Sequence, residues 1–292
     1  MTTGVALTGV KSPSIYTATE GNHRIKAKAF AELHQQKPFV LANAWDAASA
    51  RTFERAGFKA IGTTSAGIAA SRGYRDGQNI PLEEMVKTIK EIVDAVNIPI
   101  SADMEAGYGQ DIGEVIKAIR QVVSLGVVGI NIEDSTGDKR APLVDMTSQI
   151  QKIQAIRREF PIEDLWINAR IDVFYLGLFE PKEAVEETLR RAHAYIEAGA
   201  NSIFIFGTAD REILAKLAHE IKAPINFLAG PKMPTIEEMK ALGIARISLG
   251  SGPMRATLGL LEEISQELLG SGTYQKLTEK AMPFTTLQDL FL

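Results

Sequence analysis

Eight short apolar runs recur along the chain, and amphipathic helical patterns separate them. Most of these runs are continuous rather than alternating, which is typical of parallel strands covered on both faces. Eight strands, each followed by a helix or by a loop and a helix, predict a (β/α)8 TIM barrel. The predicted strands are residues 39–44, 60–64, 98–103, 127–133, 165–170, 202–206, 223–228 and 245–249.

Glycine recurs where a predicted helix passes into the next strand, at Gly57, Gly126, Gly199 and Gly243. Glycine adopts the left-handed conformation that ends a helix and turns the chain at once. Four such positions spread over the chain argue against two unrelated domains. A doubly wound open sheet is the alternative, but no glycine-rich phosphate fingerprint follows the first strand.

The two ends of the chain lie outside the repeating pattern. Residues 1–22 carry no clear period and are expected to form a flexible tail, which leaves residues 23–292 as one barrel domain. Residues 251–269 are predicted to be the final barrel helix, and residues 274–282 and 286–292 extra helical segments. The large apolar side chains of these extra segments are better explained by packing on a partner subunit, so we expect a homo-oligomer, with a tetramer favoured.

Charge and composition exclude several functions. The chain has 292 residues, a formal charge of −4 and no cysteine. This net negative charge does not indicate binding to nucleic acid or to an anionic membrane. No apolar run approaches the ~18 residues of a membrane span. A cytoplasmic location is the default expectation, because the N-terminus lacks a basic-then-apolar signal pattern. The absence of cysteine excludes disulfides, thiolate metal sites and thiol catalysis.

Acidic residues end two neighbouring predicted strands. Asp103 and Glu105 close the third strand before a break at residues 107–109, and Glu133 closes the fourth. Residues two apart on an extended chain project to the same side, and parallel strands bring their carboxyl ends together. Converging carboxylates without Cys or His suit Mg²⁺ or Mn²⁺. Helix capping or solvation explains a single acid better than it explains this group.

Other polar residues fall at the same predicted edge of the barrel. Arg170 ends the fifth strand and could clamp a carboxylate of a 2-oxo or 2-hydroxy acid by paired hydrogen bonds. The small residues after the second strand can offer backbone N–H groups to an anion, although Ser65 could equally be a turn residue. Asp46 is a candidate for substrate binding, and helix capping is its alternative role. Further candidates are Thr64, Ala66, Asp76 and Asn226.

Five motifs, taken together and in this order, give the chain a family resemblance. They are Asn43–Arg51, Gly73–Asp76, Asp103–Gly109, Ile132–Asp134 and Asn168–Arg170. Over roughly residues 25–290 the chain resembles the isocitrate lyase/phosphoenolpyruvate mutase superfamily. The resemblance implies a (β/α)8 barrel with a C-terminal helix swapped between subunits, commonly in tetramers. It also implies Mg²⁺ and the breaking or making of C–C or C–P bonds next to an enolate.

The resemblance assigns roles to individual positions. It implies that Asp103 and Glu105 belong to the metal site, with Glu105 standing where many members have Asp. It implies that Glu133 and Asp76 act largely through metal-bound water. The implied substrate contacts are the backbone of Thr64, Ser65 and Ala66, the Arg170 guanidinium over the enolate, and Asn226.

Departures from the family pattern lie in the loop after the fourth strand. Lyases that cleave isocitrate or methylisocitrate carry a Cys there, and residues 135–142 contain neither Cys nor His. Phosphonate mutases place an Asn in this loop, and residues 135–145 contain none; Phe206 also stands where mutases have a His. Lys139 is the nearest available acid or base, and its alternative role is that of a solvated charge.

These observations favour a Mg²⁺-dependent lyase or decarboxylase that acts on a small 2-oxo or 2-hydroxy carboxylic acid through an enolate. The catalytic candidates are Arg170, Lys139 and Glu133. Phosphonate chemistry on a C–P bond is one alternative. A 2-oxo acid binding protein that retained the site and lost turnover is the other.

Overall fold

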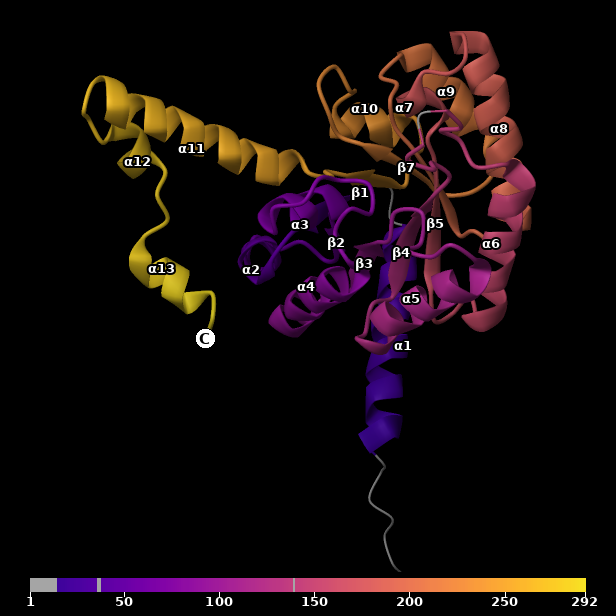
Figure 1. The fold of residues 1–292 in the computed structure, drawn as a ribbon, viewed down its shortest axis with the longest axis horizontal. Coiled ribbons are helices and arrows are strands. Elements are labelled where there is room, and N and C mark those ends of the chain that lie inside the picture. The colour runs from indigo at the N-terminus through magenta and orange to yellow at the C-terminus, as the bar shows by residue number, and fades with distance from the viewer. Residues whose placement is uncertain (1–14, 36–37, 139) are drawn as a thin grey trace, which may run out of the picture.

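Eight parallel strands close into a barrel in sequence order, which confirms the predicted architecture (Figure 1). The structure is a computed structural model and describes residues 15–35, 38–138 and 140–292. Each strand overlaps one of the eight predicted runs, and the ends differ by at most two residues. The strands are β1 (Phe39–Ala44), β2 (Ile61–Thr63), β3 (Ile100–Asp103), β4 (Gly129–Glu133), β5 (Trp166–Ile171), β6 (Ser202–Ile205), β7 (Ile225–Leu228) and β8 (Arg246–Ser248).

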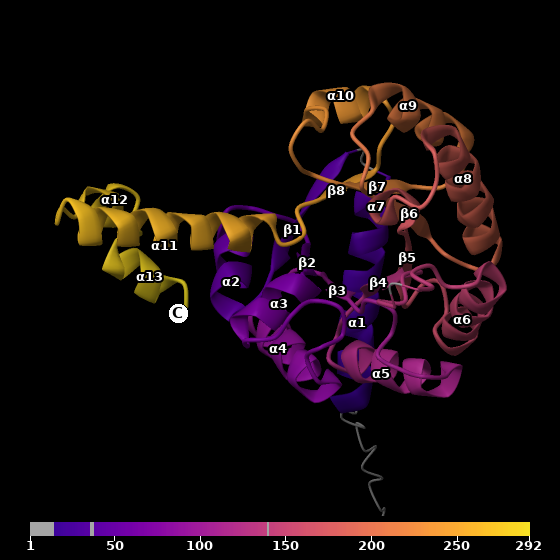
Figure 2. The same cartoon turned by 45° about the horizontal axis from the view of Figure 1, so that its top comes forward.

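A ring of helices covers the outside of the barrel (Figure 2). Their apolar residues recur with the helical period: in α5, Val115, Ala118, Ile119 and Val122 are all buried. This stripe packs on the strands and leaves the charged face in solvent. The helices of the ring are α2 (Ala47–Arg55), α4 (Leu82–Ala95), α5 (Ile112–Ser124), α6 (Met146–Glu159), α8 (Pro181–Glu197), α9 (Arg211–Glu220) and α10 (Ile236–Ala241). Two short helices, α3 (Ser65–Ser71) and α7 (Val173–Leu176), directly follow the carboxyl-terminal ends of β2 and β5.

The register of the sheet sets polar residues near the ends of neighbouring strands side by side. Asp103 of β3 pairs with Asn131 of β4, and Glu133 of β4 pairs with Arg170 of β5. The polar residues that end β3, β4 and β5 are therefore neighbours, as the parallel arrangement predicts.

Helix α1 (Ile15–Leu33) packs its carboxyl-terminal half on residues at the amino-terminal side of the strands. Phe30 is fully buried there, and the ring of His34 stacks on that of Trp166 with a centroid distance of 3.9 Å. The helix begins at Ile15, so residues 15–22 are helical although the sequence pattern assigns them to a tail. Residues 1–14 lie outside the described part of the chain.

The C-terminal segment leaves the barrel. It consists of α11 (Gly252–Gly270), α12 (Gln275–Glu279) and α13 (Phe284–Asp289), and α11 extends away from the barrel in both views (Figures 1 and 2). The prediction of a helix over residues 251–269 is confirmed, but its assignment as a helix of its own barrel wall is wrong, because Met254 is the only residue of α11 that is buried. Among the helices of the described residues, none has the length and apolarity needed to cross a bilayer.

Candidate active site

A cavity of about 280 Å³ opens at the carboxyl-terminal side of β3, β4 and β5. This size suits a small molecule, because pockets for larger ligands start at about 300 Å³. Its walls come from the end of β4, from β5 and from the loops after β2, β3 and β4. The lining includes Ser65, Asp76, Gln78, Glu105, Glu133, Ser135, Arg170 and Tyr175.

Asp103, the last residue of β3, is held beside the cavity by Ser65. Its Oδ2 accepts a hydrogen bond from the Ser65 hydroxyl at 2.8 Å and one from the Ser65 backbone N–H at 3.2 Å. Its Oδ1 is buried and has no hydrogen-bond partner among the residues described. A buried carboxylate oxygen without a partner is costly, so this atom is suited to a cation.

The loop after β3 has an uncommon backbone conformation. Glu105 and Tyr108 have positive φ angles of 48° and 56°, which non-glycine residues rarely adopt. Such conformations cluster at functional sites. The turn brings the two side chains together: the Tyr108 hydroxyl donates to Glu105 Oε1 at 2.6 Å, and the Gln78 backbone N–H donates to Oε2 at 2.7 Å.

The acids of the site repel one another. Burial raises the pKa of Glu105 to about 7, and the nearby charges of Asp103 and Asp76 add to this rise, although the hydrogen bond from Tyr108 opposes it. Burial and the charge of Asp103 also raise the pKa of Asp76. A positive ion among these groups would relieve the repulsion.

Arg170 is the cation of the site, and two carboxylates fix its guanidinium. Its Nε and Nη2 donate to the two oxygens of Asp172 at 2.6 and 3.0 Å, and its Nη1 lies 2.7 Å from Glu133 Oε2. The ring centroid of Phe206 lies 4.4 Å from Arg170 Cζ. Burial raises the pKa of Glu133, against the opposing effect of the Arg170 charge. Bidentate pairing and an aromatic neighbour give Arg170 one orientation.

The residues present fit a hard divalent cation, although the ligand set is not fully assembled. Among the described residues, no group of three or more His, Cys, Asp or Glu side chains is arranged as a metal site. Both oxygens of Glu105 already accept hydrogen bonds, whereas Asp103 Oδ1 does not. Crowded carboxylates with one open oxygen fit Mg²⁺, which usually keeps several waters.

Several predicted substrate contacts have their side chains engaged elsewhere. Asp46 caps α2 by accepting from the Ser49 N–H at 2.7 Å, and Thr64 caps α3 by accepting from the Gly67 N–H at 3.3 Å. Asn226 is fully buried and exchanges hydrogen bonds of 3.1 Å with the hydroxyl of Ser248. Their roles in binding substrate, like that of Ala66, stay predictions. Lys139 lies outside the described residues.

The site residues assigned from the sequence leave out two that line the cavity, Gln78 and Tyr175, and two that hold its lining residues, Tyr108 and Asp172. Tyr108 stands within the glycine break that follows the acids, and Asp172 follows Arg170 by two positions, so both lie next to recognised motifs. Gln78 and Tyr175 line the cavity but carry no signal in the sequence, because a loop and the short helix α7, neither of which has a periodic pattern, bring them there.

The fold and the site together define a class of protein: a (β/α)8-barrel enzyme whose site contains several acids and an arginine. The sequence model of the phosphoenolpyruvate phosphomutase family matches residues 30–269. An uncharacterised protein of Mycobacterium tuberculosis is 36% identical over 231 residues, which make up 79% of this chain and 84% of that protein. The 2,3-dimethylmalate lyase of Eubacterium barkeri is 30% identical over 222 residues, 72% of this chain and 74% of that enzyme.

The fold comparison agrees. A crystal structure of a Burkholderia cenocepacia protein, described as a lyase/mutase candidate, is 32% identical and superposes with a TM-score of 0.85. The match covers 93% of this chain and 97% of that one. The chain therefore belongs to the phosphoenolpyruvate phosphomutase family, and the resemblance drawn from the sequence motifs is confirmed. This family groups the chain with lyases and mutases of small carboxylic acids.

Proposed function

We propose that the chain is a Mg²⁺-dependent carbon–carbon lyase or decarboxylase that acts on a small 2-oxo or 2-hydroxy carboxylic acid. One observation carries the proposal. Arg170, paired with Glu133 and Asp172, lines a cavity that is also lined by the acids Asp76 and Glu105. A relative named for a lyase reaction on a substituted malate supports the carbon–carbon assignment.

Asp103 and Glu105 would hold Mg²⁺ or Mn²⁺, with Glu133 and Asp76 acting through water. When bound, the ion supplies Lewis-acid stabilisation of negative charge on a substrate oxygen. The acids would also orient the substrate, because Asp76, Glu105 and Arg170 line the same cavity. Burial and, after it, the neighbouring carboxylate charges raise the pKa of Asp76 and of Glu105, and this supports the assignment.

Arg170 would donate hydrogen bonds to the oxygen on which charge develops. If CO₂ leaves, the carbon–carbon bond breaks and its electron pair remains as an enolate that gains a proton. If an aldehyde leaves a 2-hydroxy acid, the substrate hydroxyl gives its proton to solvent, its oxygen becomes the aldehyde oxygen, and the electron pair of the broken carbon–carbon bond remains as the enolate. A fixed guanidinium stabilises this charge without reorganising during the step. The segment Thr64, Ser65 and Ala66 would hold the substrate carboxylate through the Ala66 N–H, because the Thr64 N–H donates to the Ala44 carbonyl and the Ser65 N–H to Asp103. Asp46 and Asn226 would be further contacts. Lys139 or solvent would supply the proton, and Glu133 would keep Arg170 in place.

Two other functions remain candidates. The family model is named for a phosphomutase, which favours phosphonate chemistry, whereas Phe206 and the lack of Asn in residues 135–145 disfavour it. The absence of Cys and His from residues 135–142 favours a protein that binds 2-oxo acids without turnover.

A substrate panel separates these functions. The protein is incubated with Mg²⁺ and with oxaloacetate, 2-substituted malates or phosphonopyruvate, and pyruvate and phosphate are measured. Pyruvate without phosphate supports the lyase, phosphate release supports a phosphonate hydrolase, and binding without turnover supports the binding protein. The Asp103→Ala variant is the control, because a lyase that depends on the metal site should lose its activity in this variant.

A further inference from the structure

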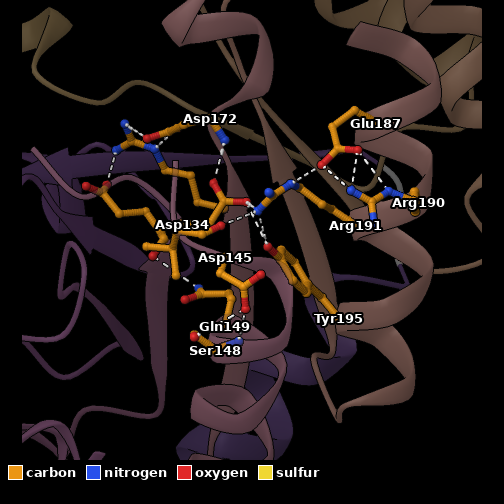
Figure 3. Close-up of polar contacts among 12 residues, drawn as sticks. Asp134, Asp145, Ser148, Gln149, Asp172, Glu187, Arg190, Arg191 and Tyr195 are labelled. Atoms are coloured by element: carbon orange, nitrogen blue, oxygen red, sulfur yellow. Dashed lines mark hydrogen bonds and ion pairs between the residues drawn. The ribbon is translucent and has the colours of Figure 1, made fainter. Parts of the chain in front are cut away.

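A buried cluster of charged and polar side chains connects α8 to the end of β4, outside the cavity (Figure 3). Its centre is Asp134, which is fully buried and follows Glu133 in the chain. Asp134 Oδ2 accepts a hydrogen bond from the Tyr195 hydroxyl at 2.8 Å and lies 3.0 Å from Arg191 Nη1. The cluster therefore fixes one oxygen of Asp134 from the helix side.

Arg191 is itself fixed at several points. Its Nε donates to Glu187 Oε1 at 2.6 Å within α8, and its Nη1 donates to the Val144 carbonyl at 3.0 Å (Figure 3). Its side chain is only 6% exposed. The guanidinium group of an arginine held in this way has a fixed orientation.

The other oxygen of Asp134 points to the site. Asp134 Oδ1 accepts the backbone N–H of Asp172 at 2.9 Å (Figure 3). Asp172 in turn holds Arg170 through two hydrogen bonds, and Glu133, the second partner of Arg170, is covalently joined to Asp134. Both carboxylates that orient Arg170 are thus attached to Asp134, one by a hydrogen bond and one by the peptide bond.

A second contact holds Glu133 from the same side. The side-chain amide of Gln149 in α6 donates to the Glu133 carbonyl oxygen at 3.1 Å (Figure 3). Burial of a charged pair is not a strong source of stability, since the loss of hydration offsets much of the attraction. A buried ion pair that ends on the partners of one cavity arginine is better explained by the need to position that arginine.

We propose that Asp134, Arg191 and Tyr195 are positioning residues that set the orientation of Arg170 through Asp172 and Glu133. The proposal rests on the function proposed above, because it assigns the cluster to the same reaction. Misplacement of a positioned group by about 1 Å can cost on the order of 100-fold in rate. Loosening the cluster should therefore lower kcat while leaving the metal site intact.

The test uses the full-length protein with the mild substitutions Tyr195→Phe and Arg191→Lys, which keep the volume or the charge. Arg157→Lys is the matched control, since Arg157 is also partly buried but donates to the carbonyls of Gly199 and Leu165 at the opposite end of the barrel. Three quantities are measured: kcat and KM for oxaloacetate with Mg²⁺, the affinity for oxalate as an enolate-like dianion, and amide hydrogen exchange at Asp172.

We expect Arg191→Lys to lower kcat about 10- to 100-fold with less than about a threefold change in KM. Amide hydrogen exchange at Asp172 should accelerate in both Tyr195→Phe and Arg191→Lys. Arg157→Lys should change neither kcat nor exchange at Asp172, even if it lowers the melting temperature. Unchanged kcat and unchanged exchange in the cluster variants would overturn the proposal, as would equal effects in Arg157→Lys.

A failure of the proposed function gives a different pattern. Wild-type protein that neither turns over oxaloacetate nor binds oxalate would contradict the lyase assignment, and the cluster would then be judged by exchange alone. If wild type binds oxalate but does not turn over oxaloacetate, the affinity of the variants for oxalate becomes the test. Weaker oxalate binding by Arg191→Lys than by Arg157→Lys would support the positioning role, and equal binding would refute it.

Discussion

At the scale of single residues, the site is defined by an excess of negative charge that its one arginine does not balance. Burial raises the pKa of Asp76 and of Glu105, and the nearby charge of Asp103 raises both further. Arg170 is already paired with Glu133 and Asp172. A further cation is the simplest means of stabilising the arrangement in its ionised form.

The metal assignment predicts a stability change. Because an ion that binds only the folded state stabilises it, Mg²⁺ or Mn²⁺ at 100 times its dissociation constant should add about 2.7 kcal/mol to the free energy of unfolding. Asp103→Ala should remove this gain, while Asp94→Ala, a change at an exposed residue of α4, should keep it. Thermal melts with and without metal measure the effect, and an equal metal-induced shift in Asp103→Ala would refute the assignment.

His34 predicts how stability depends on pH. Burial, with a contribution from the charge of Arg246, lowers the pKa of His34 to about 3, against 6.5 in the unfolded chain. The unfolded state therefore binds more protons between these values, and the free energy of unfolding should decrease as pH falls from about 6.5 towards 3, by up to about 1.4 kcal/mol per pH unit from this group.

Replacement by a ring that does not titrate isolates this effect. His34→Phe should show a shallower loss of stability than wild type between pH 6.5 and 4, measured by urea unfolding at each pH. Identical pH slopes in the two proteins would show that His34 does not remain neutral in the folded state.

At the scale of secondary-structure elements, regular patterns were predictable and local exceptions were not. The eight strands follow from continuous apolar runs, and α8 follows from an apolar face that recurs with the helical period. Arg191 lies on the buried face of α8, although the sequence pattern places it with the charged residues, because it pairs with Asp134, which directly follows β4 and is far from Arg191 in the sequence. The acids at the strand ends were predictable, whereas the Glu105–Tyr108 turn and the Asp172 pairing depend on tertiary contacts.

The turn after β3 predicts a specific sensitivity at Gly107. This residue has a φ of +110°, and a Cβ there would lie 2.8 Å from Val115 Cγ1. Gly57 has a φ of +97° with no atom within 4 Å of the added Cβ, so Gly57→Ala has the same backbone strain without the clash. Gly107→Ala should therefore cost about 1–3 kcal/mol more than Gly57→Ala.

The Gly107 change should also weaken the metal-induced stabilisation, because it moves the turn that carries Glu105. Chemical unfolding and metal titration of the two variants provide the measurement. Equal losses of stability, together with unchanged metal binding, would contradict the account of this turn.

At the scale of the whole molecule, the C-terminal segment has apolar side chains that its own barrel does not cover. Leu269 is 90% exposed and Phe284 74% exposed. Exposed apolar groups on an extended helical segment are typical of packing on another subunit, and the family resemblance implies a swapped helix.

We therefore expect a homo-oligomer, with a tetramer favoured, when mass is measured by light scattering at micromolar concentration. Leu269→Glu combined with Phe284→Glu should shift the mass towards the monomer. Ile162→Glu, a change at an exposed apolar residue outside the segment, should leave the mass unchanged. A monomeric wild type would refute the prediction.

The central claim is that Arg170 and a bound metal stabilise an enolate, and steady-state kinetics on oxaloacetate tests it most directly. A thiol reagent should have no effect, since the chain contains no cysteine, and isocitrate should be a poor substrate. After subtraction of the rate with Mg²⁺ alone, wild type should be active. Arg170→Lys should lose about 2–4 kcal/mol of transition-state stabilisation, because an ammonium cannot reproduce the planar fork. A wild-type rate no higher than that of free Mg²⁺, or a variant as fast as wild type, would contradict the mechanism.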